Sequence, residues 1–304
     1  MFLGSCHRSS DTLEPKINYA IQDKYLKSLP SPFFPLTPEE KQQDWGKEYQ
    51  IGMAFAHELD LYQAITAFKR AEILAPLEAK QRKLEIQYEI LLCYYLGRKY
   101  SDVIYTFENS DLRFVDDQFL AKRDLLLILY DSYEQAGEEE KAARILQFIQ
   151  QNDPKTSKEL VFSSALQRAD FPILKQFDSE PDAPSYLHNL LTTYDAGKKS
   201  ASTAQALNAS IPGAGYFYLG QNQTGVTALL INALFIAAAY HFFAHGNTAA
   251  GIITTSFEAG WYFGGIYGAK EEAKFYNERL YEAYATPMMN QKKLFPALML
   301  KYSF

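Results

Sequence analysis

The feature that most constrains this chain is a stretch almost free of charge in its last third. Between Ala201 and Ala269 there is no Lys or Arg, and the only acid is Glu258. The region 37–200 before it is dense in Asp, Glu, Lys and Arg. A shift this sharp marks a boundary between a soluble part and a membrane part. We therefore expect a soluble domain over 37–200 and a membrane module over 201–277.

Two apolar segments lie inside the uncharged stretch, at 224–243 and 248–269. At about 1.5 Å per residue, each reaches across the roughly 30 Å hydrocarbon core of a bilayer. Only Ala244–Asn247 separate them, so they are expected to form an antiparallel hairpin. The alternative is a pair of buried helices in a soluble core, but the near absence of charge around both circumferences favours lipid. The prediction is a transmembrane helical hairpin.

The second apolar segment carries a small residue at every fourth position, a pattern that lets helices approach closely. This ridge is predicted to pack on the Ala-rich first segment, at Ala233 and Ala237, or on a second copy of the protein. Its members are Ser256, Gly260, Gly264 and Gly268.

Glu258 is expected to have a partner, because an ionisable group at this depth costs about 2.5–3.5 kcal/mol. Asn232 in the first segment lies at nearly the same distance from the hairpin turn. We predict a hydrogen bond from the Asn232 side chain to the Glu258 carboxyl. The pair would clasp the two helices with Glu258 protonated, or would form part of a proton or substrate relay.

The soluble domain is predicted to be a stack of helical repeats. It begins with "TPEE" at 37–40, in which Thr37 and Glu40 form a capping box around Pro38 at the first helical position. Small and aromatic residues then recur at Gly52, Phe55, Ala64, Phe68, Ala71 and Pro76. This pattern resembles the tetratricopeptide repeat, here over Trp45–Glu78, and implies two antiparallel helices that touch at the small residues.

Looser copies of the pattern follow further along the chain. Their members are Tyr94, Val103 and Phe107, and then Tyr133, Ala142 and Leu146, with Gly137 in a turn. Three repeats are about the minimum for a stable stack. Residues 157–197 are predicted to add two or three short helices that cap it. Cys93, inside the apolar run "EILLCYYL", is expected to be a buried thiol.

The resemblance also implies a concave face that binds partners, formed by fixed positions of each repeat. The face would be aromatic and acidic, which suits a peptide with apolar and basic residues. The alternative is that these residues contact the chain's own N-terminal tether or capping helices. They are Tyr49, Met53, His57, Tyr88, Leu92, Tyr95, Leu127, Asp131 and Glu134.

The segment before the hairpin, "PGAGYFYLG" at 212–220, combines turn residues with aromatic ones. It predicts an interfacial turn that feeds the first membrane helix. Together with "EAGWYFGGIYGA" at 258–269, it resembles a glycine-rich two-helix membrane module of bacteria, whose outline covers 205–277. That module is often carried behind tetratricopeptide repeats in envelope proteins, so the resemblance implies a location in the cell envelope.

Both ends of the chain carry short motifs. "LGSC" at 3–6 is similar to a bacterial lipobox, in which Cys6 would be lipidated and residues 1–36 would form a tether. Only two residues precede the motif, whereas a signal peptide needs about 7–15 apolar ones, so lipidation implies a longer leader. At the other end, alternating apolar residues in "LMLKYSF" at 298–304 predict a short strand or extended tail docked on the surface, within a tail over 278–304.

The two topology signals disagree. Lys270, Lys274 and Arg279 directly follow the hairpin, and by the positive-inside rule they place the repeats in the cytoplasm. The lipobox places the repeats outside. We favour the outside, in the periplasm, because the resemblance to an envelope module agrees with it.

Nothing in the sequence indicates an enzyme. The histidines have no metal-ligand spacing, and there is neither a nucleophile elbow nor a phosphate loop, so no metal or cofactor is expected. A net charge of −6 gives no reason to expect nucleic acid. The expected function is an all-α envelope scaffold that binds proteins or peptides through its repeats and lipid through its hairpin, with possible self-association through the glycine ridge. The alternatives are a small transport or channel component around Glu258 and a cytoplasm-facing platform for membrane-protein biogenesis.

Overall fold

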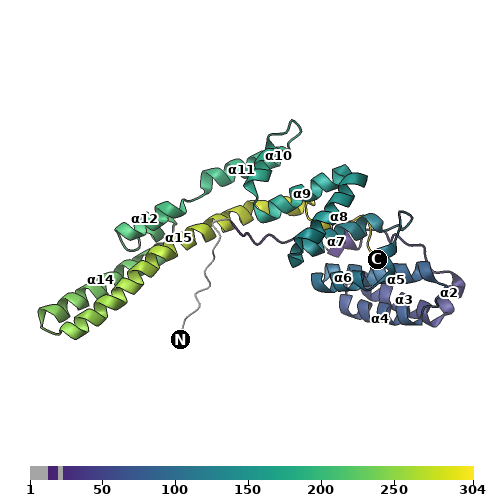
Figure 1. Ribbon diagram of the computed structural model, residues 1–304, viewed down its shortest axis with the longest axis horizontal. Coiled ribbons are helices and arrows are strands. Elements are labelled where there is room, and N and C mark those ends of the chain that lie inside the picture. The colour runs from purple at the N-terminus through teal and green to yellow at the C-terminus, as the bar shows by residue number, and fades with distance from the viewer. Residues whose placement is uncertain (1–12, 20–22) are drawn as a thin grey trace. The chain divides into compact units, whose positions relative to one another are not determined.

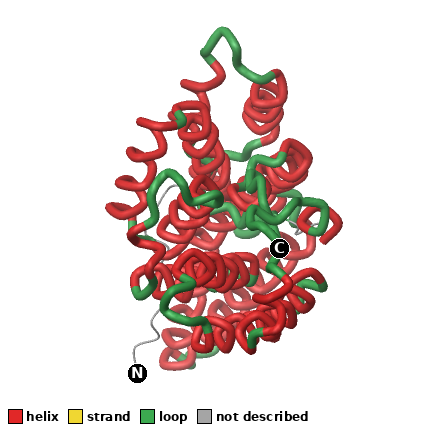
Figure 2. Tube along the Cα trace, turned by 90° about the vertical axis from the view of Figure 1, so that its right-hand side faces the viewer, coloured by secondary structure: helices red, strands yellow, loops and turns green. Residues whose placement is uncertain are grey.

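A computed structural model describes residues 13–19 and 23–304 of the chain. Its regular elements are helices joined by loops, and Figure 2 shows no strand in the part described, so the all-α prediction is confirmed. The chain divides into two compact units. Of the described residues, the repeat unit comprises 19, 23–164 and 289–304, and the hairpin unit comprises 13–18 and 165–288. The repeat unit is therefore completed by residues from the far end of the chain.

The repeat unit contains a series of helical hairpins packed in chain order (Figure 1). Helices α3 and α4, α5 and α6, and α7 and α8 form the three predicted pairs. The elements are α1 (Asp23–Leu26), α2 (Pro38–Gln42), α3 (Asp44–His57), α4 (Leu61–Leu74), α5 (Lys80–Leu96), α6 (Tyr100–Glu108), η1 (Asp111–Phe114), α7 (Lys122–Ala136) and α8 (Glu139–Asn152).

Local sequence rules explain several features of this stack. Thr37 Oγ1 accepts from the Glu40 backbone N–H at 3.2 Å, and Glu40 Oε2 accepts from the Thr37 backbone N–H at 2.8 Å. The predicted capping box is therefore confirmed. A Cβ added at Gly52 would lie 2.5 Å from the Phe68 ring, which explains the small residue where α3 meets α4. Gly137 ends α7 at φ +76°, a conformation that suits glycine. Cys93 is fully buried, as expected.

The hairpin unit follows the stack with helices of very different length. Three helices occupy the stretch where two or three capping helices were predicted. The elements are α9 (Pro154–Arg168), which crosses from the repeat unit, α10 (Phe171–Asp178), α11 (Ser185–Gly197), α12 (Ala201–Ser210), α13 (Ala214–Tyr218), α14 (Asn222–Ala244) and α15 (Thr248–Lys292). Figure 1 shows α14 beside the first part of α15, to which the short turn at residues 245–247 connects it.

Helix α15 differs from the prediction. A membrane helix ending at Ala269 and a separate tail from 278 were expected, but one helix of 45 residues runs through both points. The change from apolar to charged residues at Lys270 is a change of solvent preference and not a helix stop signal. Residues 270–286 are rich in Glu, Lys, Arg and Ala, which favour helix. The first glycine or proline after Lys270 is Pro287, close to the boundary between the two units.

The tail after α15 also differs from the prediction of a strand or a surface-docked segment. It forms a short 3-10 turn, η2 (Pro296–Leu298), and then an irregular stretch. Its side chains are buried rather than resting on the surface, with Phe295 only 1% and Leu300 only 2% exposed. The alternation of apolar residues arises from burial in the repeat unit and not from strand pairing.

Candidate functional site

The predicted partner-binding residues lie on the first helices of the three hairpins, but most are inaccessible. Tyr88, Leu92, Tyr95 and Leu127 are completely buried, and Tyr49 and Asp131 are less than 10% exposed. Met53 and Glu134 are half-buried, and only His57 is exposed. The structure thus gathers the predicted residues on α3, α5 and α7 and encloses the central ones.

The N-terminal segment of the chain, described at residue 19 and from residue 23 to 36, covers part of this face. It runs antiparallel to α5, because the Tyr19 carbonyl accepts from Arg98 just beyond the end of α5, whereas the Phe34 carbonyl accepts from Arg82 near its start. Between them, the Phe33 ring packs edge-on against Tyr88 with centroids 5.6 Å apart. The alternative stated above, contact with the chain's own tether, is therefore what the structure shows at Tyr88.

Two buried acids lie on this part of the stack. Tyr95 donates its hydroxyl hydrogen to Asp131 Oδ2 at 2.6 Å, and burial raises the pKa of Asp131 to about 6. Glu89 is fully buried on α5, and neither carboxyl oxygen has a hydrogen-bond partner. Burial raises the pKa of Glu89 well above its ordinary value, so the folded protein holds this side chain neutral. No pattern in the sequence indicates that Glu89 is buried, because a glutamate beside apolar residues is more often at a helix surface.

The hairpin unit exposes a large apolar surface. Helix α14 is the one helix in the described part of the chain that is long and apolar enough to cross a membrane. Within α15 no stretch reaches the same hydropathy, since glycines, hydroxyl residues and Glu258 dilute its first half. The large apolar side chains exposed on α14 and on residues 248–269 of α15 are Val226, Leu229, Leu230, Leu234, Ile236, Tyr240, Phe243, Ile252, Ile253, Phe257, Trp261, Phe263 and Tyr267.

Most of the predicted glycine ridge does not pack against α14. A Cβ added at Gly260 or Gly264 would meet no other atom within 4 Å, whereas one at Gly268 would lie 2.6 Å from the Tyr216 hydroxyl. The Ser256 side chain is exposed and bonds to the Ile252 carbonyl of its own helix. The ridge therefore approaches α13 at its end and is open in its middle, where the predicted contact with α14 is absent.

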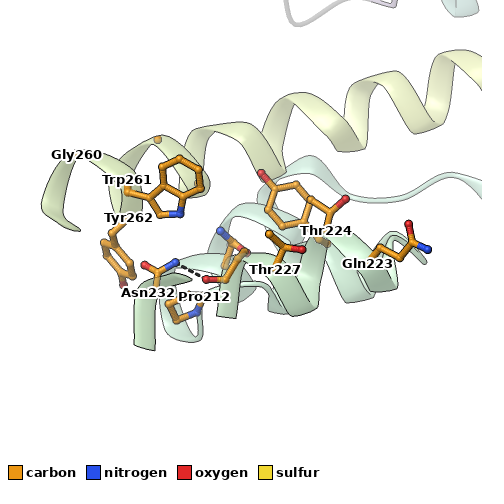
Figure 3. Close-up of a pocket in the computed structure, with 13 residues that line it drawn as sticks. Pro212, Gln223, Thr224, Thr227, Asn232, Gly260, Trp261 and Tyr262 are labelled. Carbon is orange, nitrogen blue, oxygen red and sulfur yellow. Dashed lines mark hydrogen bonds between the residues drawn. The ribbon is translucent and has the colours of Figure 1, made fainter. Parts of the chain in front are cut away.

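A cavity of about 550 Å³ lies beside these open glycines. It is framed by the α12–α13 turn, by one face of α14 and by α15, and its lining carries no charge (Figure 3). The polar residues that line it are Asn208, Tyr216, Gln223, Thr224, Thr227, Asn232 and Tyr262.

The predicted hydrogen bond between Asn232 and Glu258 is not formed. The Asn232 amide instead donates to the Ala228 carbonyl of its own helix at 2.6 Å, as Figure 3 shows. Asn232 Oδ1 and Glu258 Oε2 are both buried without a donor. Equal distance from the turn sets only the level of two residues along the hairpin, not whether their side chains meet.

The "PGAGYFYLG" turn is built on close backbone approaches. Gly213 has φ +92°, and a Cβ there would overlap the Gly225 carbonyl at the start of α14. At Gly215 a Cβ would overlap the Ala204 carbonyl and lie 2.9 Å from Ala269 of α15. The Asn208 side chain accepts the Gly213 N–H at 2.9 Å. The glycines therefore let α12, α13, α14 and α15 meet in one place, a role that the sequence indicated only as a turn.

The lipidation site and metal binding complete the survey of predicted sites. Cys6, the predicted lipidation site, lies outside the described residues. Among the residues that are described, no group of three or more His, Cys, Asp or Glu side chains could hold a metal ion.

Comparison with known proteins identifies no family. No protein-family model, no curated protein and no solved structure matches the chain. What stands is an all-helical protein of stacked helices with one long apolar helix, while the resemblance to tetratricopeptide repeats and to the envelope module stays a prediction.

Proposed function

We propose that this protein is a membrane-attached scaffold of the bacterial envelope, which binds other proteins through tetratricopeptide-like repeats and is anchored by the α14–α15 hairpin. The observation that carries the membrane attachment is the exposed apolar surface of the hairpin. A soluble monomer rarely exposes a continuous apolar patch of more than a few hundred Å². Each large side chain moved from water into lipid gains about 1.5–3 kcal/mol. Lipid is therefore the solvent that suits this surface.

The proposed location in the periplasm is supported by the lipobox-like motif at residues 3–6 and by the resemblance of residues 205–277 to an envelope module. Lipidation at Cys6 would add a second anchor, and two anchors hold a protein on a membrane far more stably than one. In this arrangement the repeats lie in the periplasm. Lys270, Lys274 and Arg279, beyond the apolar part of α15, favour the opposite orientation. Labelling of an introduced cysteine at exposed Glu139 by an impermeant maleimide in intact spheroplasts distinguishes the two.

The chain's two tryptophans provide the test of membrane attachment. Trp45 lies in the repeat unit and is buried, and Trp261 lies on α15 in the proposed membrane segment. The variant Trp45→Phe keeps only Trp261 as a fluorophore. In vesicles of lipids brominated on their acyl chains, Trp261 emission is expected to be quenched strongly relative to vesicles of ordinary lipid.

The matched control is Trp261→Phe, which keeps only Trp45 and is expected to show no quenching by the same lipids. Equal Trp261 emission in brominated and ordinary vesicles, with the protein bound to both, would remove the proposed insertion of the hairpin.

A transport role remains the second candidate, and the unpartnered Glu258 Oε2 inside an otherwise uncharged hairpin favours it. A proton relay requires an ionisable group at that position. The Glu258→Gln variant is therefore expected to abolish any pH-dependent flux into vesicles if the hairpin forms a relay, and to leave membrane attachment and partner binding intact if it is a scaffold.

A further inference from the structure

The last residues of the chain are held in the repeat unit in the way that a bound peptide is held. After α15 ends at Lys292, the segment 294–304 lies beside the N-terminal segment and against α7. We refer to this segment as the tail and to the surface that receives it as the groove. Exposed fractions are 9% or less for Leu294, Phe295, Ala297, Leu298, Leu300, Ser303 and Phe304.

Side chains of the groove bind the backbone of the tail. Asp124, which is fully buried at the start of α7, accepts the N–H groups of Lys301 at 2.7 Å and Tyr302 at 2.9 Å through one carboxyl oxygen. Arg123 donates to the Met299 carbonyl at 3.1 Å. Since these bonds involve only backbone atoms of the tail, they recognise an irregular or extended segment whatever its sequence.

The opposite wall of the groove is supplied by the N-terminal segment. The Tyr25 hydroxyl donates to the carbonyls of Leu298 at 2.9 Å and Leu300 at 3.3 Å. The Pro30 carbonyl accepts from the Ser303 N–H at 3.1 Å. The backbone of the tail is thus hydrogen-bonded from both sides, as the backbone of a bound peptide is in a recognition groove.

Apolar side chains give the groove its sequence preference. Phe295 packs against the Tyr19 ring with centroids 5.5 Å apart, and Leu298, Leu300 and Phe304 are buried. The Lys301 side chain, by contrast, is exposed. The groove therefore selects a segment that makes a short turn and then runs irregularly, with apolar residues at the spacing of Phe295, Leu298 and Leu300. It tolerates a cation directly after the last of these residues.

We propose that the groove is the partner-binding site of the scaffold and that the tail is its resident intramolecular ligand. A partner enters as an apolar segment of another protein, with the same turn and irregular backbone, that replaces the tail. This inference rests on the proposed scaffold function and adds the chemistry of its partner. A tethered tail competes at an effective concentration on the order of millimolar, so the groove is closed to weak ligands until the tail is released.

The test uses the full chain and a fluorescent peptide with the sequence of residues 294–304. The paired change Leu298→Asp and Leu300→Asp weakens the tail but leaves the groove intact. The variant is expected to bind the added peptide at least 10-fold more tightly than the unmodified chain does, with one peptide per chain. Adding Asp124→Asn to this variant is expected to weaken peptide binding again by at least 10-fold, because the two backbone N–H groups lose their charged acceptor.

The matched control is Lys301→Ala, which removes an exposed side chain of the tail and keeps the backbone bonds, so its peptide binding should equal that of the unmodified chain. If the tail variant is folded by circular dichroism and binds no better than the unmodified chain, the proposal is overturned. If it loses helical signal, the peptide is expected to restore it, and failure to do so also overturns the proposal. Exchange of tails between two copies would appear as dimers in the unmodified chain and would contradict an intramolecular ligand.

This outcome is independent of the membrane experiment. Peptide binding without Trp261 quenching would support the proposed groove and contradict the proposed membrane anchor. Quenching without peptide binding would support the anchor and contradict the proposed partner site.

Discussion

Glu89 shows how a single buried acid can make the stability of the repeat unit depend on pH. Its pKa in the folded protein is raised by burial well above the value of about 4.5 that it has when exposed. The folded state therefore holds the proton more tightly than the unfolded state does. The contribution of protonated Glu89 to the free energy of unfolding is complete below pH 4.5. It falls as the pH rises above that value, because unfolding then releases a proton.

The Glu89→Gln variant is expected to unfold at higher urea concentration than the unmodified chain at pH 8, and at nearly the same concentration at pH 4. The gain is about 1.4 kcal/mol for every unit by which burial raises the pKa. Urea unfolding in detergent micelles, followed by Trp45 fluorescence in the Trp261→Phe background, measures it. Glu139→Gln, at an exposed position of α8, is the control and should change little. If the free energies of unfolding of Glu89→Gln and of the unmodified chain differ by the same amount at pH 4 and at pH 8, a neutral buried Glu89 is contradicted.

Asp131 is expected to contribute a narrower pH dependence of the same sign. Its pKa rises from 3.8 to about 6 on burial, so the stability that the protonated form provides is lost between these two values. The loss is on the order of 3 kcal/mol. In Asp131→Asn the free energy of unfolding should change less between pH 4 and pH 6 than in the unmodified chain. If the free energy of unfolding changes equally with pH in both proteins, the raised pKa of Asp131 is contradicted.

The residues that the sequence identified correctly follow from local rules. Thr37 and Glu40 are three positions apart and cap a helix wherever they occur in that order. Gly52 and Phe68 belong to one hairpin, so their contact follows from spacing. Glu89 escaped prediction, because its burial depends on segments far away in the sequence that cover α5.

At the scale of elements, the α12–α13 turn depends on the absence of a side chain at Gly215. The variant Gly215→Val would force its Cβ onto the Ala204 carbonyl and its methyl groups toward Asn208 and Ala269. Overpacking of this kind costs about 1–3 kcal/mol or more. Thermal unfolding in detergent, read from Trp261 in the Trp45→Phe background, is expected to shift to lower temperature.

The comparison variant for this prediction is Gly264→Ala in α15. An added Cβ there meets nothing within 4 Å, and Ala favours helix over Gly by roughly 1 kcal/mol. The midpoint temperature of thermal unfolding of this variant should be unchanged or slightly higher than that of the unmodified chain. Equal destabilisation by both variants would show that general helix strain, and not the close approach at Gly215, is responsible.

Element boundaries were predicted well where a stop signal exists and poorly where only the solvent changes. The turns at Gly137 and at Gly246 carry the positive φ that ends a helix. No such residue stands at Lys270, so α15 continues through the predicted end of the membrane module. The alternation at 298–304 predicts a short strand or an extended tail docked on the surface, because it has the same appearance in these and in a buried irregular segment.

At the scale of the whole molecule, composition and packing divide the chain differently. The charge boundary near residue 200 separates a charge-dense region from an almost uncharged one, whereas the compact units separate at 164 and 288. The contribution of residues 289–304 to the repeat unit depends on contacts of high sequence separation, such as Asp124 with Tyr302. No local pattern in a single sequence carries that information.

Two compact units joined by helices are expected to unfold separately. Each has a buried core of its own, and Pro287, beside one of the junctions, lacks the N–H that would bond to the carbonyl four residues earlier in α15. We expect two transitions in urea, one reported by Trp45 and one by Trp261. Glu89→Gln should move only the Trp45 transition and Gly215→Val only the Trp261 transition, because changes at distant sites without shared partners act independently. The combined variant should show both shifts, each within about 0.5 kcal/mol of its value alone. A single transition at both tryptophans, displaced by either variant, would mean that α9 and α15 couple the units into one cooperative structure.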